Sequence, residues 1–232
     1  MHTRQADPAF VPSDIEFREV FGVAFAQKRN NVLFTPAHLS NVVTGDEHSS
    51  LPPAAQRDLV LASICLKYTQ SNSVGYARNG QMIGVGAGQQ SRVDCVKLAG
   101  RKVATWYLRQ HPKVQGLPFK STTKRQARVN ARVRYIEGDI TAAERVQWLQ
   151  NFDGEPEMLT DAERASFLMS LDGVSISSDA FFPFRDSIDH ASKIGVRYVA
   201  QAGGSVADEE VIAACKEYGM EMAFTGLRLF HH

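Results

Sequence analysis

The sequence has no excess of charge of either sign and no long apolar run. Its 26 Lys and Arg residues are matched by 25 Asp and Glu residues, so the formal net charge is +1. Such a balance provides no basic field for a nucleic-acid backbone, and we expect no nucleic-acid partner. No stretch approaches the roughly 20 apolar residues of a membrane span, and residues 1–8 lack the apolar core of a signal peptide. These absences predict a cytoplasmic protein without a membrane partner.

Cysteines are few, and several catalytic signatures are missing. Cys65, Cys95 and Cys215 are odd in number and lie in no CxxC pattern, so we expect reduced and mostly buried thiols. The sequence contains no HxE with PCxxC, no GxSxG and no Walker A motif. A zinc deaminase centre, a nucleophile elbow and a P-loop are therefore excluded.

What is present indicates a soluble α/β protein with a sizeable core, since 44% of the residues are hydrophobic. A nearly all-round apolar helix is expected over 53–68, and Asn79-Gly80 between apolar runs predicts a hairpin. Strands and helices then alternate towards the C-terminus, which predicts a largely parallel sheet. The expected elements there are strand 174–177, helix 186–194, strand 196–201, helix 207–218 and strand 221–225.

The remaining segments divide the chain. Residues 1–15 are expected to form a loose arm, and 16–232 one domain portion within which 115–172 is a polar, helical, insertion-like region. Alternating apolar residues predict a strand over 17–25, and Pro36 a short helix over 36–43. Ser91 with Asp94, Thr141 with Glu144 and Thr160 with Glu163 are expected helix starts.

Glycine-rich turns are the first candidates for a binding site. Gly84, Gly86 and Gly88 precede Arg92, which lies in the first turn of a helix, where a cation is slightly unfavourable. That placement suggests an anionic ligand nearby, although turn geometry alone also explains the glycines. The turn Gly203-Gly204-Ser205 is a second candidate for holding an anion.

Two further segments combine polar or aromatic side chains at the ends of expected elements. KYTQSNS (67–73) either satisfies helix-end carbonyls or forms a site with a neutral amide and several oxygens. SSDAFFPF (177–184) follows a strand, where α/β sheets place ligands, and its phenylalanines either clamp a flat heterocycle or form a hydrophobic corner.

Five segments in order carry a family resemblance: KYTQSNSV, NGQMIGVGAGQQSRVDCVKLAG, SISSDAFFPFRD, QAGGSVADEEVIAAC and RLFHH. Together with FGVAFAQKRNN they resemble the C-terminal part of the AICAR transformylase domain of the bifunctional AICAR transformylase/IMP cyclohydrolase family, over about 16–232. The resemblance implies a cytidine-deaminase-like layered α/β domain, the second transformylase subdomain. It also implies purine biosynthesis, with transfer of a formyl group from the co-substrate 10-formyltetrahydrofolate to AICAR ribotide, giving FAICAR.

The resemblance implies site residues position by position. Asn72 is similar to the catalytic asparagine, a donor suited to the formyl oxygen. The implied substrate-binding residues are Phe181, Arg228, Phe230 and His232. The implied folate-binding residues are Arg92, Phe181 and Pro183. The implied ligands of a potassium-like cation are Thr69, Ser71, Ser73 and Asp179.

The sequence departs from the family in one respect that matters for activity. The family has a Lys-His pair in its first transformylase subdomain, and no Lys-His dipeptide occurs here. The first subdomain and the cyclohydrolase domain are also unmatched, as in a fragment, a split gene product or a degenerate copy. We therefore expect a chain that is inactive alone and acts as a homodimer or with a complementing subdomain. The alternative is a non-catalytic ligand-binding or interaction module; a nicotinamide-dependent reductase rests only on the glycine turns.

Overall fold

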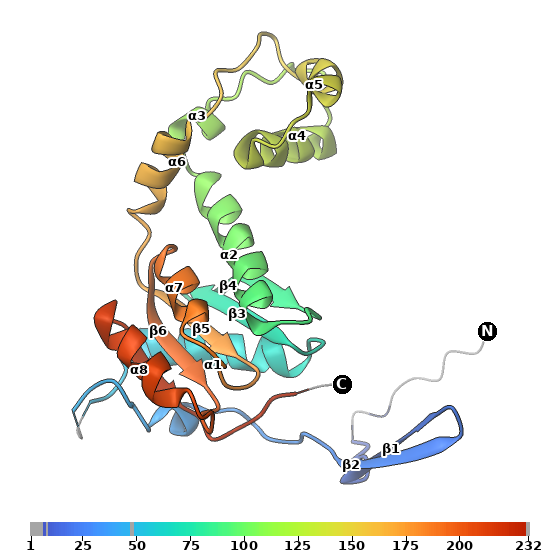
Figure 1. Ribbon diagram of the computed structural model, residues 1–232. Coiled ribbons are helices and arrows are strands. Elements are labelled where there is room, and N and C mark those ends of the chain that lie inside the picture. Colours follow the sequence, from blue (N-terminus) through green and yellow to red (C-terminus); the bar gives the residue numbers. More distant parts are fainter. Residues whose placement is uncertain (1–6, 8, 47–48, 231–232) are drawn as a thin grey trace. The chain divides into compact units, whose positions relative to one another are not determined.

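The computed structural model describes residues 7, 9–46 and 49–230, which form two compact units, 1–33 and 34–232 (Figure 1). The described part of the first unit contains an antiparallel hairpin of β1 (Ile15–Val20) and β2 (Val23–Lys28). The prediction of one strand over 17–25 is therefore wrong. The chain reverses at Phe21 and Gly22, which both have positive φ. Gly22 alone is a usual turn residue, and Phe21 beside it does not favour positive φ, so the residue types only weakly indicate the reversal.

The second unit is built on a five-stranded sheet in the order β4-β3-β5-β6-β7. Its strands are β3 (Ser73–Arg78), β4 (Gln81–Ala87), β5 (Val174–Ser178), β6 (Val196–Gln201) and β7 (Glu221–Phe224). The last three strands are parallel, as expected, but β3 is antiparallel to both β4 and β5. The sheet is thus mixed rather than largely parallel, because the Asn79-Gly80 hairpin adds two antiparallel strands.

Helices cover both faces of this sheet. One face packs against α1 (Pro53–Lys67), with Leu66 beside Gly75 of β3. The 3-10 turn η1 (Pro36–Leu39), shorter than the predicted helix over 36–43, contributes Leu39 to the same core. The other face packs against α2 (Arg92–Leu108), α7 (Asp186–Ser192) and α8 (Asp208–Glu217). The second unit is a layered α/β domain.

Glycines bring α2 unusually close to the sheet. A Cβ on Gly84 or Gly86 of β4 would collide with the backbone carbonyl of Ala99 or Cys95 in α2. These glycines therefore serve helix–strand packing rather than approach to a ligand. Ser91 caps α2 as expected, accepting a hydrogen bond from the Asp94 N–H at 3.2 Å. Packing and cap together fix where the first turn of α2 lies.

Four helices between α2 and β5 form a separate core. They are α3 (Pro112–Gln115), α4 (Arg125–Glu137), α5 (Ala142–Leu149) and α6 (Asp161–Leu168). We call residues 112–168 the helical segment. Its core is centred on Tyr135, Trp148 and Phe152. The predicted helix starts at Thr141 and Thr160 are confirmed as capping boxes. Among the described helices, none is both long and apolar enough to cross a membrane.

Candidate functional site

Three segments that are distant in the sequence meet at one end of the sheet. Because β3 is antiparallel to β5, its first residues lie beside the last residues of β5, and Val74 pairs with Ser178. On the other side of β3, Ser73 pairs with Ala87 at the end of β4. Asn72, Asp179 and the start of α2 are therefore neighbours. This is also the edge at which the parallel strands end, where α/β proteins bind ligands.

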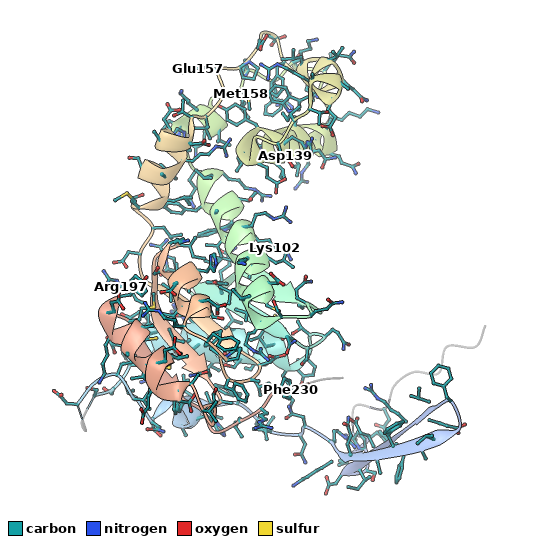
Figure 2. All side chains as sticks on the ribbon, viewed as in Figure 1. Lys102, Asp139, Glu157, Met158, Arg197 and Phe230 are labelled. Atoms are coloured by element: carbon teal, nitrogen blue, oxygen red, sulfur yellow. The ribbon has the colours of Figure 1, made fainter. Side chains whose placement is uncertain are left out.

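A cavity of about 420 Å³ opens at this edge. Of the predicted site residues, the sheet and loops bring Asn72, Arg92, Phe181, Pro183 and Phe230 to its wall. Figure 2 labels Phe230, which follows β7 in the chain. Three phenylalanines and a proline give the cavity flat apolar sides, while Asn72 and Arg92 supply polar groups. Apolar walls with few convergent polar groups are typical of small-molecule sites.

Arg92 is turned into the protein. Its side chain is 6% exposed and forms an ion pair with Asp179, whose side chain is fully buried. The guanidinium also donates to the Ser178 hydroxyl at 3.0 Å. The inference that a cation in the first turn of α2 requires a nearby anion is thus satisfied by Asp179 of the chain itself. A buried pair of this kind is held by its complete set of hydrogen bonds.

The four predicted cation ligands lie directly behind the cavity wall. Asp179 Oδ2 accepts hydrogen bonds from the Ser71 hydroxyl at 2.7 Å, the Ser73 hydroxyl at 3.0 Å and the Ser73 N–H at 2.9 Å. The Thr69 hydroxyl lies 2.8 Å from the Ser73 hydroxyl. We call Thr69, Ser71, Ser73, Ser178, Asp179 and Arg92 the Asp179 cluster. The structure brings the four residues together, and their role in binding a cation stays a prediction.

The carboxamide of Asn72 is held on both sides. Its Oδ1 accepts from Arg92 at 2.9 Å, and its Nδ2 donates to the Gln89 carbonyl at 3.1 Å. The Ser71–Asn72 peptide bond is cis. The Cys95 thiol donates to the Asn72 carbonyl at 3.1 Å, and burial raises the pKa of this thiol, which keeps it protonated. Asn72 therefore presents its remaining amide hydrogen from a fixed frame.

Two arginines lie over phenylalanine rings at this site. Arg228 is exposed, and its guanidinium carbon is 5.9 Å from the centre of the Phe181 ring. Arg92 lies at the same distance from the ring of Phe230. Arg228 reaches the aromatic wall but is not one of the residues that line the cavity. The predicted substrate residue His232 lies outside the described residues.

The glycine turn before α8 is filled by the chain itself. The N–H groups of Gly204 and Ser205 both donate to Asp208 Oδ2, at 2.7 and 3.1 Å. An anion-holding turn is therefore present as predicted, but its anion is the carboxylate of Asp208. A ligand phosphate would have to displace that side chain.

Sequence reasoning missed several residues that line the cavity. Phe184 belongs to the SSDAFFPF segment that was already a candidate, whereas Asp186 lies two residues beyond it and was not named, although its place in the FFPFRD run was a usable signal. Gln90 and Val93 flank the helix cap, and nothing in their residue types pointed to a site. Asp186 adds the cavity's carboxylate, which can accept hydrogen bonds from amino or ring N–H groups.

The donor set at the Asp179 cluster suits a hard cation. In the described part of the chain no group of three or more His, Cys, Asp or Glu side chains could hold a metal ion. The four predicted ligands, Thr69, Ser71, Ser73 and Asp179, instead offer three hydroxyls and one carboxylate, with no nitrogen or sulfur ligand, as alkali cations prefer. The Ser71 and Ser73 hydroxyls donate to Asp179, and their protons would have to turn away from a bound ion.

Fold and site define a layered α/β protein with a ligand cavity at the end of its sheet. A sequence model of the AICARFT/IMPCHase bienzyme family matches residues 2–102. The bifunctional purine biosynthesis protein PurH of Magnetococcus marinus is 36% identical over 179 residues, covering 77% of this chain and 24% of the relative. The chain belongs to the AICAR transformylase/IMP cyclohydrolase family, and it spans about a quarter of the length of this relative.

Proposed function

We propose that this chain supplies one wall of a formyl-transfer site in purine biosynthesis, where 10-formyltetrahydrofolate donates its formyl group to AICAR ribotide. The observation that carries the proposal is the gathering of Asn72, Arg92, Phe181, Pro183 and Phe230 around one cavity. Family membership makes this chemistry the natural assignment for that cavity. The finer fold assignment, a cytidine-deaminase-like second transformylase subdomain, is part of the same proposal.

The reaction needs an oxygen to be stabilised, and Asn72 has a suitable group. Attack of the amine of AICAR ribotide on the formyl carbon places negative charge on the formyl oxygen. The bond from the folate nitrogen to that carbon then breaks, and the product amine loses a proton. Asn72 lines the cavity, and its Nδ2 carries a second amide hydrogen beside the one donated to the Gln89 carbonyl. A fixed neutral donor stabilises such an oxyanion more than it stabilises the ground state.

The aromatic side chains and Arg228 serve binding. Phe181, Phe184 and Phe230 offer faces and edges on which flat heterocycles such as imidazole or pterin pack. Arg228, exposed beside Phe181, has the planar fork of donors that suits the phosphate of a ribotide. We assign ribotide contacts to Phe181, Arg228, Phe230 and His232. Contacts with folate are assigned to Arg92, Phe181 and Pro183.

A potassium-like cation would be held by Thr69, Ser71, Ser73 and Asp179. Its contribution would be positive charge that fixes the 69–73 loop, from which Asn72 projects. Arg92 already pairs with Asp179, so the loop is held in part by the chain's own cation. The cation is therefore proposed as structural support for Asn72.

A second function has a specific observation in its favour. The chain covers 24% of its relative and contains no Lys-His dipeptide, so the family's proton acceptor is not supplied by this sequence. Loss of a general acid or base typically lowers a rate about 100-fold or more. A ligand-binding or interaction module without turnover is consistent with this. A formyltransferase would instead take this proton acceptor from a complementing subdomain, because a second copy of residues 1–232 carries no Lys-His pair either.

Calorimetric titration of AICAR ribotide, followed by a folate analogue, tests the proposal on the wild-type chain and on Arg228→Ala. We expect saturable binding that Arg228→Ala weakens about ten- to 100-fold, the usual cost of a lost charge-assisted hydrogen bond. Arg197→Ala is the matched control, because Arg197 pairs with Asp172 at the opposite end of β6 (Figure 2). A folded chain that binds neither probe would contradict the proposal.

A further inference from the structure

A second cavity lies between α2 and α4. Its volume is about 400 Å³, and it shares no lining residue with the cavity at the end of the sheet. The side chains that line it come from β4, from α2 with its C-cap and from α4: Ile83, Arg101, Lys102, Thr105, Trp106, Arg109, Val133 and Glu137. A cavity of this size can hold a small molecule.

One side of α2 gathers positive charge at this second cavity. Arg101 and Arg109 lie about two turns apart, and Lys102 lies between them on the same side of the helix (Figure 2 labels Lys102). Glu137 of α4 is the carboxylate opposite them, 4.0 Å from Arg101. The described lining residues thus contribute three cations and one carboxylate. Like charges at helical spacing repel, so a bound anion would relieve that repulsion.

Within the described part of the chain, two of these three cations have no carboxylate partner. Lys102 Nζ donates to the Val85 carbonyl at 2.5 Å, which engages one of its three N–H groups and does not neutralise its charge. Arg109 is exposed and forms no ion pair with a described residue. In this they differ from Arg92, whose charge is met by the buried Asp179. The second cavity therefore has uncompensated positive charge available to an anion.

An indole ring forms part of the same wall. Trp106 is half-buried, packs against the core of the sheet and lines the cavity. Its ring lies 6.2 Å from that of Tyr107, with the two planes at 33°. Ile83 and Val133 add apolar surface to the cavity. An indole offers a large flat surface for a heterocycle, and apolar walls with a few charged groups are typical of small-molecule sites.

We propose that the second cavity is a further binding site, which takes a flat heterocycle carrying a phosphate, such as a nucleoside monophosphate. The ring packs on Trp106, and the phosphate oxygens accept hydrogen bonds from Lys102 and Arg109. This site shares no residue with the formyl-transfer cavity and does not rest on the proposed function. Binding to it is therefore measurable without turnover.

Nuclear magnetic resonance of the full ¹⁵N-labelled chain tests the site. Adenosine 5′-monophosphate is added to about 5 mM, a range that reaches millimolar dissociation constants. The chain has two tryptophans, and the indole signal lost in Trp106→Phe is that of Trp106. We expect a saturable shift of this signal and a much smaller change at Trp148, which is 6% exposed. A Trp106 signal that does not move overturns the proposal.

Two variants separate the cations of the cavity from charge in general. Arg109→Ala should weaken binding of the nucleotide about tenfold, because a charge-assisted hydrogen bond to phosphate is lost. Arg125→Ala is the matched control, since it removes an exposed arginine of α4 that does not line the cavity. Neither arginine has an ion-pair partner among the described residues, so neither change strands a carboxylate. Unchanged affinity in Arg109→Ala overturns the proposal.

The two parts of the ligand are tested by separate titrations with adenosine and with inorganic phosphate. Each should bind at least about tenfold more weakly than the nucleotide, because each makes only part of the contacts. If either part binds as tightly as the nucleotide, the proposed joint role of Trp106 and the cations is overturned.

The remaining comparison distinguishes the second cavity from the formyl-transfer cavity. Arg228→Ala should leave the nucleotide-induced shift of Trp106 unchanged, because Arg228 lies beside Phe181 at the formyl-transfer cavity. A Trp106 shift that disappears in Arg228→Ala would mean that the nucleotide acts from there, which overturns the proposal. A chain that binds the nucleotide at Trp106 but does not bind AICAR ribotide supports this site and contradicts only the proposed function.

Discussion

The Asp179 cluster and the helical segment use charged side chains in opposite ways. In the cluster, one arginine and one carboxylate are buried and share a closed set of hydrogen bonds. In the helical segment, ion pairs such as Lys113 with Glu157 lie at the surface, while the core is aromatic. Figure 2 labels Glu157 and Asp139 among these surface charges. Polar groups at the sheet edge thus specify a geometry, whereas in the helices packing supplies the stability.

The largest effect should follow from breaking the buried pair. Asp179→Ala leaves the guanidinium of Arg92 buried without a counter-charge, and we expect a loss of about 3–5 kcal/mol in the free energy of unfolding. Asp172→Ala removes the exposed partner of Arg197 and should cost below about 1 kcal/mol. Urea unfolding of both variants measures the contrast. Equal losses would show that burial does not distinguish the two pairs.

Packing in the helical segment should matter nearly as much, but locally. Trp148 is 6% exposed and its indole N–H donates to the Ala131 carbonyl at 2.9 Å. Trp148→Ala should cost about 3 kcal/mol and speed hydrogen exchange in α4 and α5. Because the sheet has its own core, exchange in β3 and β5 should change little. Equally fast exchange in those strands would mean that the two cores unfold as one.

Removal of either of two helix caps should lower the stability by a smaller amount, and the two losses should be nearly equal. Ser91→Ala at α2 and Thr160→Ala at α6 each remove a side-chain acceptor, and each should cost about 1 kcal/mol. Only Ser91 adjoins Arg92, whose guanidinium donates to Asn72, so only Ser91→Ala should also speed hydrogen exchange of the Asn72 side-chain amide with water. Chemical denaturation measures the two stabilities, and nuclear magnetic resonance of the ¹⁵N-labelled chain measures the exchange rate. A response of Asn72 to Thr160→Ala would contradict the separation of the two regions.

The smallest effect concerns the pH dependence of an exposed pair. The Lys113 ammonium, helped by the Thr160 cap, lowers the pKa of Glu163 from its ordinary 4.5 to about 2. A lowered folded-state pKa stabilises the fold above the ordinary value, and this contribution disappears as the pH falls towards 2. Glu163→Gln should therefore flatten a slight fall in melting temperature between pH 5 and pH 2. An identical fall in both proteins would exclude Glu163 as its source.

Local signals in the sequence predicted the local structure well. Asn79-Gly80, Ser91, Thr141 and Thr160 act through their own backbone neighbours, and each produced the predicted turn or cap. The turn at Phe21 was missed because its residue type does not favour positive φ. The packing role of Gly84 and Gly86 could not be predicted either, because it depends on the close approach of α2, where an added Cβ would collide with the helix backbone.

The candidate site shows more clearly that contacts between distant segments cannot be predicted from local sequence signals. The resemblance selected Asn72, Arg92, Phe181, Pro183 and Phe230, and the structure places them around one cavity. It did not show that Arg92 faces inward, because that orientation depends on Asp179, which lies far along the chain. The contact of Asp208 with the turn at Gly204 could not be predicted either, since the sequence does not show which carboxylate accepts hydrogen bonds from the N–H groups of the turn.

The order in which the cavity residues are synthesised has a consequence for the nascent chain. Asn72 and Arg92 leave the ribosome before the other cavity residues, and Phe230 follows about ten seconds or more later at usual rates of translation. Until Asp179 emerges, the Arg92 guanidinium lacks the carboxylate with which it pairs in the folded domain, and Ser71 and Ser73 lack the acceptor of their hydrogen bonds. Metabolites present during translation would therefore find the complete cavity wall only after Phe230 has emerged, so a ligand could not guide the folding of the earlier segments.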